Sequence, residues 1–110
     1  MTPTEPVWTR AERDAVLAVL SEESKWCRGA VSMDKDRLPV FYPASETAVS
    51  WSLDGAIDLV AQGTLRFGEL CGFMSRHLKG GGVMAWNDAP ERTYADVRRA
   101  LETLPVKEGP

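Results

Sequence analysis

The chain has 110 residues, with 13 lysines and arginines against 16 aspartates and glutamates, so its formal net charge is −3. This composition, 44% hydrophobic and 26% charged, excludes a disordered tail, a collagen-like chain and a small disulfide scaffold. A chain of this length buries about two-thirds of its surface on folding, enough for one hydrophobic core. We therefore expect a single globular domain over residues 1–110, with residues 1–8 and 105–110 as loose ends.

The distribution of charged and apolar residues bears on partners and location. Charges of both signs are interspersed, so the basic stripe that phosphate contacts require is missing, and we expect no direct nucleic-acid binding. Residues 1–6 lack the basic and apolar segments of a signal peptide. The longest nearly apolar stretches, 15–20 and 56–61, are far shorter than the roughly 20 residues of a membrane span. We expect a cytoplasmic protein whose two cysteines, Cys27 and Cys71, are reduced.

The first half of the chain predicts a helix followed by a β-hairpin. Thr9 and Glu12 have the spacing of a capping box, and apolar residues recur at helical intervals after them, so we expect a helix over residues 10–26. Residues 30–42 alternate in polarity on both sides of a charged turn, which predicts a short β-hairpin. Pro39 limits the second arm of this hairpin to an edge strand, because proline has no backbone N–H to donate.

The second half predicts three more helices. We expect one to begin after Ser45 or Thr47, and another to open with the capping box formed by Thr93 and Asp96. Residues 87–90, shortly before Thr93, are expected to form a turn. The clearest helical spacing belongs to the apolar side chains Phe67, Leu70, Cys71, Met74 and Leu78. The predicted fold is mainly α, of the α+β class, with about four helices around one core and a hairpin near residues 30–42.

Three motifs, each built on a tryptophan, stand out along the chain. They are Trp26-x-x-Gly29-Ala30, Trp51-x-x-x-Gly55-Ala56 and Trp86-Asn87-Asp88-Ala89-Pro90-x-Arg92-Thr93. Together they resemble a family of small bacterial and phage proteins that is catalogued as a domain of unknown function, over about residues 10–104. In that family the second motif usually carries a cysteine where this chain has Ser52. The resemblance implies a compact fold and brings no activity with it.

Two uses of these motifs remain open. In one, they are architectural: a Gly-Ala pair lets another backbone approach closely, and a tryptophan beside it fills the core. In the other, they form a binding site in which an indole ring stacks, an amide recognises polar groups and a guanidinium binds an anion. The candidate binding residues are Trp86, Asn87, Asp88, Arg92, Trp26 and Arg28.

The order Cys27, His77, Asn87 is the sequence pattern that most resembles an enzyme, because papain-like peptidases use a thiol, a histidine base and an orienting amide. Two observations argue against this role. Cys27 follows the predicted first helix, whose C-terminal dipole raises a thiol's pKa, and His77 lies in a helical pattern. Cys27, Cys71 and His77 also lack the paired spacing of zinc ligands. We assign no catalytic residue, no metal and no cofactor.

The remaining hypothesis is a non-enzymatic, protein-binding or regulatory protein. Four tryptophans are more than a small core needs, and tryptophan and arginine dominate interface hot spots. The family resemblance suggests one form of this hypothesis, an inhibitor of a host defence complex such as an anti-CRISPR protein. The alternatives are a cysteine hydrolase using Cys27, or a nucleotide-handling enzyme using Asp88 and Arg92. A homodimer built on an exposed helix face also remains open.

Overall fold

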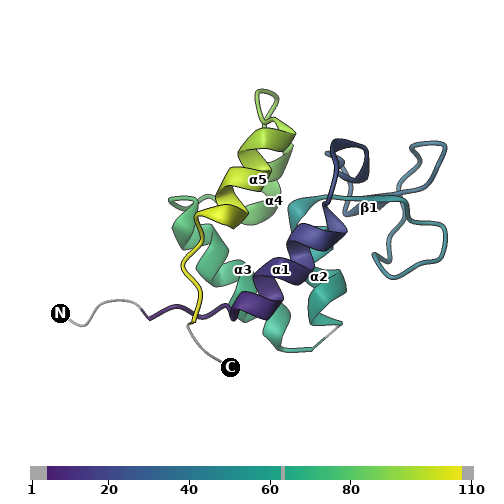
Figure 1. Cartoon of the computed structure of the whole chain (residues 1–110). Coiled ribbons are helices and arrows are strands. Elements are labelled where there is room, and N and C mark those ends of the chain that lie inside the picture. The colour runs from purple at the N-terminus through teal and green to yellow at the C-terminus, as the bar shows by residue number, and fades with distance from the viewer. Residues whose placement is uncertain (1–4, 63, 108–110) are drawn as a thin grey trace.

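The computed structural model describes residues 5–62 and 64–107 (Figure 1). Residues 1–4 and 108–110, which belong to the ends expected to be loose, lie outside the described residues. In chain order the elements are α1 (Arg10–Val19), the 3-10 turn η1 (Glu23–Lys25), β1 (Ser32–Met33), β2 (Ser50–Trp51), α2 (Leu53–Ala61), α3 (Arg66–His77), α4 (Val83–Asp88) and α5 (Tyr94–Glu102). The described part of the chain therefore has the predicted mainly helical, α+β class, with five α-helices where about four were expected.

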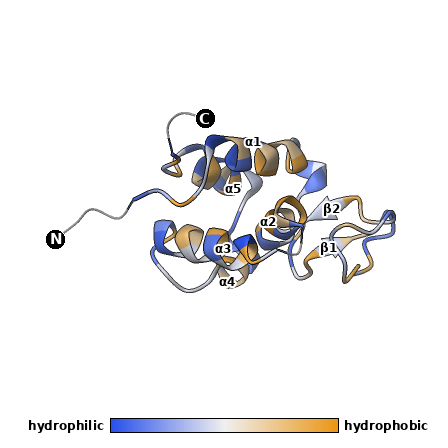
Figure 2. Ribbon diagram, turned by 90° about the horizontal axis from the view of Figure 1, so that it is seen from below, coloured by the Kyte–Doolittle hydropathy of each residue, from blue (hydrophilic) through white to orange (hydrophobic). Residues whose placement is uncertain are grey.

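The helices form two groups with the core between them. Figure 2 shows α1 and α5 on one side of the molecule and α2, α3 and α4 on the other. Helix α2 is central, since it contacts α1, α3 and α4. The two short strands and the long segment that joins them lie at one end of the molecule, beyond α2 (Figures 1 and 2). None of the helices in the described ranges has the length and apolarity needed to cross a bilayer.

The core consists of apolar side chains from every α-helix and from the segment before α1. Burying one such large side chain contributes roughly 1.5–3 kcal/mol, so this cluster is the main favourable term in folding. Most of α2 is buried, which agrees with its central place. The large apolar side chains with no exposed surface are Trp8, Val16, Leu20, Leu53, Ile57, Leu70, Met74, Val97 and Leu101.

Helix α1 is shorter than the sequence predicts. Its capping box is present, since the Thr9 hydroxyl accepts from the Glu12 N–H at 3.1 Å and the Glu12 carboxylate accepts from the Thr9 N–H at 2.8 Å. The helix nevertheless ends at Val19 and not near residue 26. Two glutamates follow within four residues, and negative charge is unfavourable at the C-terminal end of a helix. Trp26 consequently lies in extended backbone after η1.

The start of α2 also differs from the prediction. The helix was expected to begin after Ser45 or Thr47, but it begins at Leu53 with Ser52 as its N-cap. The segment before it is held in the small sheet instead, because the Val49 N–H donates to a carbonyl of β1 at 2.8 Å. Long-range pairing with β1 thus overrides the local capping signals.

The turn expected at residues 87–90 is in part the end of a helix. Asn87 and Asp88 are the last two residues of α4. The chain leaves the helix at Ala89, which has φ −57° and ψ 136°. The ring of Pro90 disfavours helical backbone at the residue before it, so the helix ends there.

The predicted hairpin is present with a different second strand. Ser32 and Met33 pair antiparallel with residues 50–51 and not with the expected arm at 38–42. The charged turn does form, since the Asp34 N–H donates to the Leu38 carbonyl at 2.9 Å, and a single bridge joins residues 33 and 39. Pro39 cannot donate to a ladder, which explains why this arm stops at one bridge and leaves β1 to pair with a strand later in the chain.

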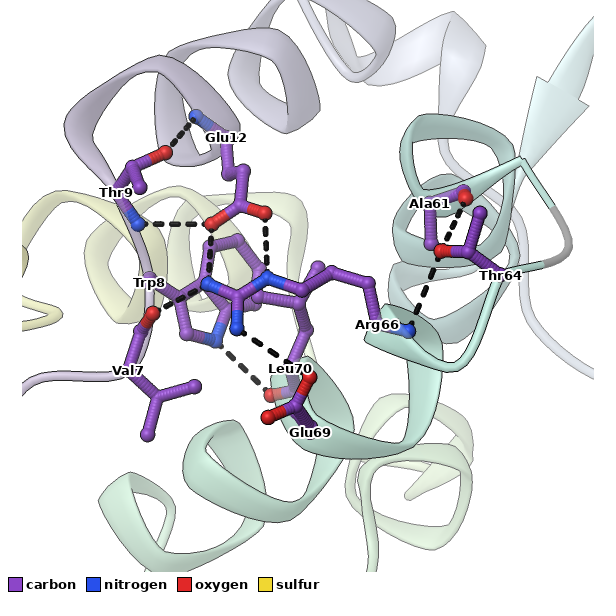
Figure 3. A network of polar contacts seen from close by, with 9 residues as sticks. All are labelled: Val7, Trp8, Thr9, Glu12, Ala61, Thr64, Arg66, Glu69 and Leu70. Carbon is purple, nitrogen blue, oxygen red and sulfur yellow. Dashed lines mark hydrogen bonds and ion pairs between the residues drawn. The ribbon is translucent and has the colours of Figure 1, made fainter.

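The two chain ends are better ordered than predicted over part of their length. Trp8 is fully buried, and its indole N–H donates to the Leu70 carbonyl of α3 at 2.9 Å (Figure 3). The Lys107 N–H donates to the Trp8 carbonyl at 2.8 Å, so the described C-terminal residues run beside the start of α1. The expectation of loose ends is therefore wrong at residues 8 and 107. The Trp8 side chain is buried against α3, and its backbone carbonyl binds the Lys107 N–H.

An ion pair ties the same region to α3. The Arg66 guanidinium donates to both oxygens of the Glu12 carboxylate at 2.7 Å and also to the Val7 carbonyl (Figure 3). These bonds to Arg66, together with the Thr9 N–H, lower the pKa of the Glu12 carboxyl from 4.5 to about 2. The Glu12 carboxylate therefore caps α1 and also fixes the start of α3 through Arg66.

Candidate functional site

The three tryptophan motifs meet at Asn87, near the end of α4. The Asn87 amide oxygen accepts from the Trp26 indole N–H at 2.7 Å and from the Leu53 N–H at 3.0 Å. Its amide nitrogen donates to the Cys27 carbonyl at 3.1 Å and to the Asp88 carboxylate at 2.9 Å. An amide side chain has two acceptor sites and two N–H donors, so these bonds use its whole capacity. Asn87 is fully buried and joins the first motif, the start of α2 and α4.

Asp88 and Arg28 hold the first motif against the end of the third. The Asp88 carboxylate accepts from the Gly29 N–H at 3.0 Å. One nitrogen of the Arg28 guanidinium donates to the carbonyls of Ala89 and Pro90, at 3.1 and 2.8 Å. Arg28 thus fastens the first motif to the backbone that directly follows α4.

Trp86 and Arg92 contact each other across the connection between α4 and α5. The Arg92 guanidinium carbon lies 3.9 Å from the centroid of the Trp86 ring, and its Nε donates to the Trp86 carbonyl at 2.8 Å. A cation–π contact of this kind contributes about 0.5–1 kcal/mol at a partly exposed site. A further nitrogen of Arg92 lies 3.9 Å from the Asp96 carboxylate in α5.

The second motif begins α2. The Ser52 hydroxyl accepts from the Gly55 N–H at 3.1 Å and donates to the buried Asp54 carboxylate at 2.7 Å. A Cβ atom at Gly55 would lie 1.9 Å from the Val31 carbonyl oxygen, so only glycine lets the two backbones approach this closely. The Trp51 indole N–H donates to the Pro43 carbonyl at 2.8 Å. The motif therefore connects the start of α2 to Val31, which precedes β1, and to Pro43, which lies between the two strands.

The structure brings the six candidate binding residues together and gives each a contact within the chain. Asn87 has no polar atom left for a ligand, whereas Trp26, Asp88 and Arg92 are half-buried and Arg28 is exposed. Burial among partners of the same chain is the arrangement that the architectural interpretation describes. A binding role for these residues remains a prediction.

Cys27 and His77 have separate surroundings. Cys27 is 3% exposed, its thiol lies 3.6 Å from the Ala30 carbonyl, and burial raises its pKa. The His77 Nε2 lies 3.1 Å from both the Ala100 carbonyl and the Thr103 hydroxyl at the end of α5. Burial is the largest cause of the raised Cys27 pKa, and α1 ends well before this residue.

The other polar groups of the described chain form no recognised metal site. Within residues 5–62 and 64–107, no three His, Cys, Asp or Glu side chains are grouped so that they could hold a metal ion. Cys71 is half-buried in α3, and burial raises its pKa to about 12. Both cysteines are free thiols.

Four large exposed apolar side chains lie on residues 34–49, here called the 34–49 loop, which none of the sequence motifs pointed to. Its exposed side chains are Leu38 at 59%, Phe41 at 83%, Tyr42 at 77% and Val49 at 47%. Figure 1 shows the loop beyond β1, away from α3 and α5. A signal was present in the sequence: Pro39 and Pro43 lie on either side of the two aromatic residues, and proline limits strand pairing.

Three surface hollows surround this region. One of about 440 Å³ lies between the 34–49 loop and α2, and is lined by Tyr42, Pro43, Ala44, Asp58, Leu59 and Gln62. A second, of about 260 Å³, is lined by Asp34, Lys35, Asp36, Glu46, Thr47 and Val49. The third, of about 480 Å³, is lined mainly by polar groups of Glu23, Ser24, Trp26, Cys27, Arg28 and Arg37.

Comparison with known proteins identifies a family and no activity. No curated protein and no solved structure matches the chain significantly. The model of a family of unknown function, DUF6197, matches residues 9–104, a range that includes all three tryptophan motifs. The chain therefore belongs to the family of unknown function DUF6197.

Proposed function

We propose that this chain is a non-enzymatic regulatory protein that binds a protein partner through the 34–49 loop. The observation that carries the proposal is the exposure of two adjacent aromatic side chains, Phe41 at 83% and Tyr42 at 77%. Leu38 and Val49 on the same loop are also exposed. Soluble proteins seldom leave several large apolar side chains together in water, and such patches mark interaction sites. Aromatic residues are moreover enriched at the centre of protein interfaces.

The backbone on both sides of the aromatic pair is fixed, which supports a binding role. The Ser32 hydroxyl donates to the Val40 carbonyl, and the Val40 N–H donates back to the Ser32 carbonyl at 2.8 Å. On the other side, the Trp51 indole N–H donates to the Pro43 carbonyl. A loop that is ordered before binding loses less conformational entropy when a partner docks. In this proposal the tryptophan motifs supply the scaffold and the loop supplies the contact surface.

A narrower form of the proposal is an inhibitor of a host defence complex, of the anti-CRISPR type, acting in the cytoplasm. Its support is the small size of the chain and an exposed aromatic surface carried on a scaffold that uses its other aromatic side chains internally. The two free thiols agree with a reducing compartment. This form requires that the captured partner be a subunit of such a complex and that the purified chain lower the activity of that complex.

The test is affinity capture from a host lysate at physiological salt, with wild type beside two variants. Phe41→Ser with Tyr42→Ser removes the aromatic pair from the loop. Leu65→Ser is the matched control, because Leu65 is 93% exposed and lies outside the loop. We expect wild type and the control to retain the same partner and the double variant to lose it, with unchanged helical circular dichroism. A partner that all three retain equally would contradict the proposal.

A further inference from the structure

We propose that the hollow between the 34–49 loop and α2 receives an apolar side chain from a partner segment that carries lysine or arginine beside it. This inference rests on the proposed function and adds the chemistry of the partner. Tyr42, Pro43 and Ala44 line the hollow from the loop, and Asp58, Leu59 and Gln62 line it from the end of α2. Its volume of about 440 Å³ falls within the range of side-chain and ligand pockets.

The shape of the hollow is held by contacts outside its lining. Pro43 is buried, and its carbonyl accepts from the Trp51 indole N–H at 2.8 Å. The opposite wall is the end of α2, where the buried side chains Ile57 and Ala61 on the other face of the helix pack into the core. Both walls are therefore fixed before a partner arrives, so an inserted side chain gains apolar contact without ordering the loop.

The charge around the exposed aromatic residues favours a basic partner. The proposed hollow contains one carboxylate, and a second hollow on the same loop contains three carboxylates and one ammonium group. These are Asp34, Asp36, Glu46 and Asp58 against Lys35. Within the described ranges no ion pair holds the carboxylates of Glu46 and Asp58. Arg37, the other cation of the loop, lines the separate polar hollow beside Cys27.

The same charges argue against a second copy of this chain as the occupant. In a symmetric dimer built on this surface, each patch meets its own copy, so two surfaces with an excess of negative charge would face each other. Like charges across an interface are unfavourable, whereas lysine or arginine beside an apolar anchor complements both the hollow and its rim. The occupant that fits is a segment of a different protein.

The experiment is selection of binders from a displayed library of random peptides, with the purified full chain as bait. Enriched peptides are then measured by fluorescence anisotropy against wild type, F41S/Y42S, E46Q/D58N and the control L65S. We expect enriched peptides to carry lysine or arginine next to leucine or an aromatic residue. F41S/Y42S should weaken their binding at least about tenfold, as for hot-spot residues. E46Q/D58N should weaken it by about threefold to tenfold at low salt and less at high salt, and L65S should have no effect.

The outcomes separate this inference from the proposed function. Enriched peptides that are acidic or uncharged, yet lose binding in F41S/Y42S, would overturn the basic chemistry and leave the loop as a contact surface. Peptides that bind F41S/Y42S as tightly as wild type would count against both proposals. A library that yields no binder would overturn the docking of a linear segment. A dimer in sedimentation that F41S/Y42S dissociates would assign the surface to a second copy and overturn the inference.

Discussion

Replacing Asn87 with alanine should destabilise the protein more than any change to an exposed residue of the same motif. The substitution removes the hydrogen-bond partners of the Trp26 indole N–H, the Leu53 N–H and the Cys27 carbonyl. A buried polar group left without a partner costs about 1–3 kcal/mol. The bonds to Leu53 and Cys27 are buried, which raises the cost, whereas water reaches part of the site after truncation, which lowers it. We therefore expect the free energy of unfolding to fall by about 3–5 kcal/mol. That is a large share of the roughly 5–15 kcal/mol by which such domains are stable.

Urea denaturation followed by circular dichroism and tryptophan fluorescence measures this loss. With a urea dependence of about 1.5 kcal/mol/M, the midpoint should fall by about 2–3 M. Glu91→Ala is the matched control: Glu91 belongs to the same stretch of sequence and is exposed, so its replacement should change stability by less than about 0.5 kcal/mol. If Asn87→Ala costs less than about 1 kcal/mol, the amide is not the point that joins the three motifs.

The remaining predictions concern backbone approach, acid stability and the thiols. Gly55→Ala should lower the urea midpoint sharply, because the added Cβ would lie 1.9 Å from a carbonyl oxygen. The control Gly68→Ala, whose Cβ would meet nothing within 4 Å, should raise the free energy of unfolding by about 0.5–1 kcal/mol. Equal effects of the two substitutions would refute this prediction. Because folding lowers the pKa of Glu12 from 4.5 to about 2, its contribution is present above pH 4.5 and is lost as the pH falls toward 2. Denaturation at several pH values should therefore show the stability difference between wild type and Glu12→Gln shrinking over that window, and a constant difference would contradict it. Cys27 and Cys71 should both react slowly with iodoacetamide at neutral pH until urea is added, because burial raises both pKa values; fast alkylation of Cys27 alone would favour the hydrolase.

Local signals in the sequence predicted two capped helix starts and failed where contacts between distant segments decided the outcome. The capping boxes at Thr9 and Thr93 are both present, since each depends on two side chains three residues apart and on nothing else. The end of α1 and the start of α2 were wrong. The capping signals at Ser45 and Thr47 lost to pairing of residues 50–51 with β1, a contact between segments that no local pattern specifies.

The tryptophan motifs were recognisable in the sequence, but their meeting point was not. Residues 26, 53 and 87 are far apart in the chain, and Asn87 joins them through its four hydrogen bonds. The structure of the 34–49 loop was predicted wrongly because its local pattern was misleading. Its alternating apolar residues resemble a half-buried strand, and only the tertiary structure shows that Phe41 and Tyr42 are exposed.

The sequence by itself determined the mainly helical class, the capped starts of α1 and α5 and the membership in a family of unknown function. These features depend on spacing within a few residues, where backbone geometry fixes which side chains meet. The tertiary structure decided which strand pairs with β1, how Trp8 anchors both ends and which aromatic side chains face water. Those outcomes depend on how whole elements compete to bury apolar surface and satisfy polar groups, and this competition is settled only when the chain is packed.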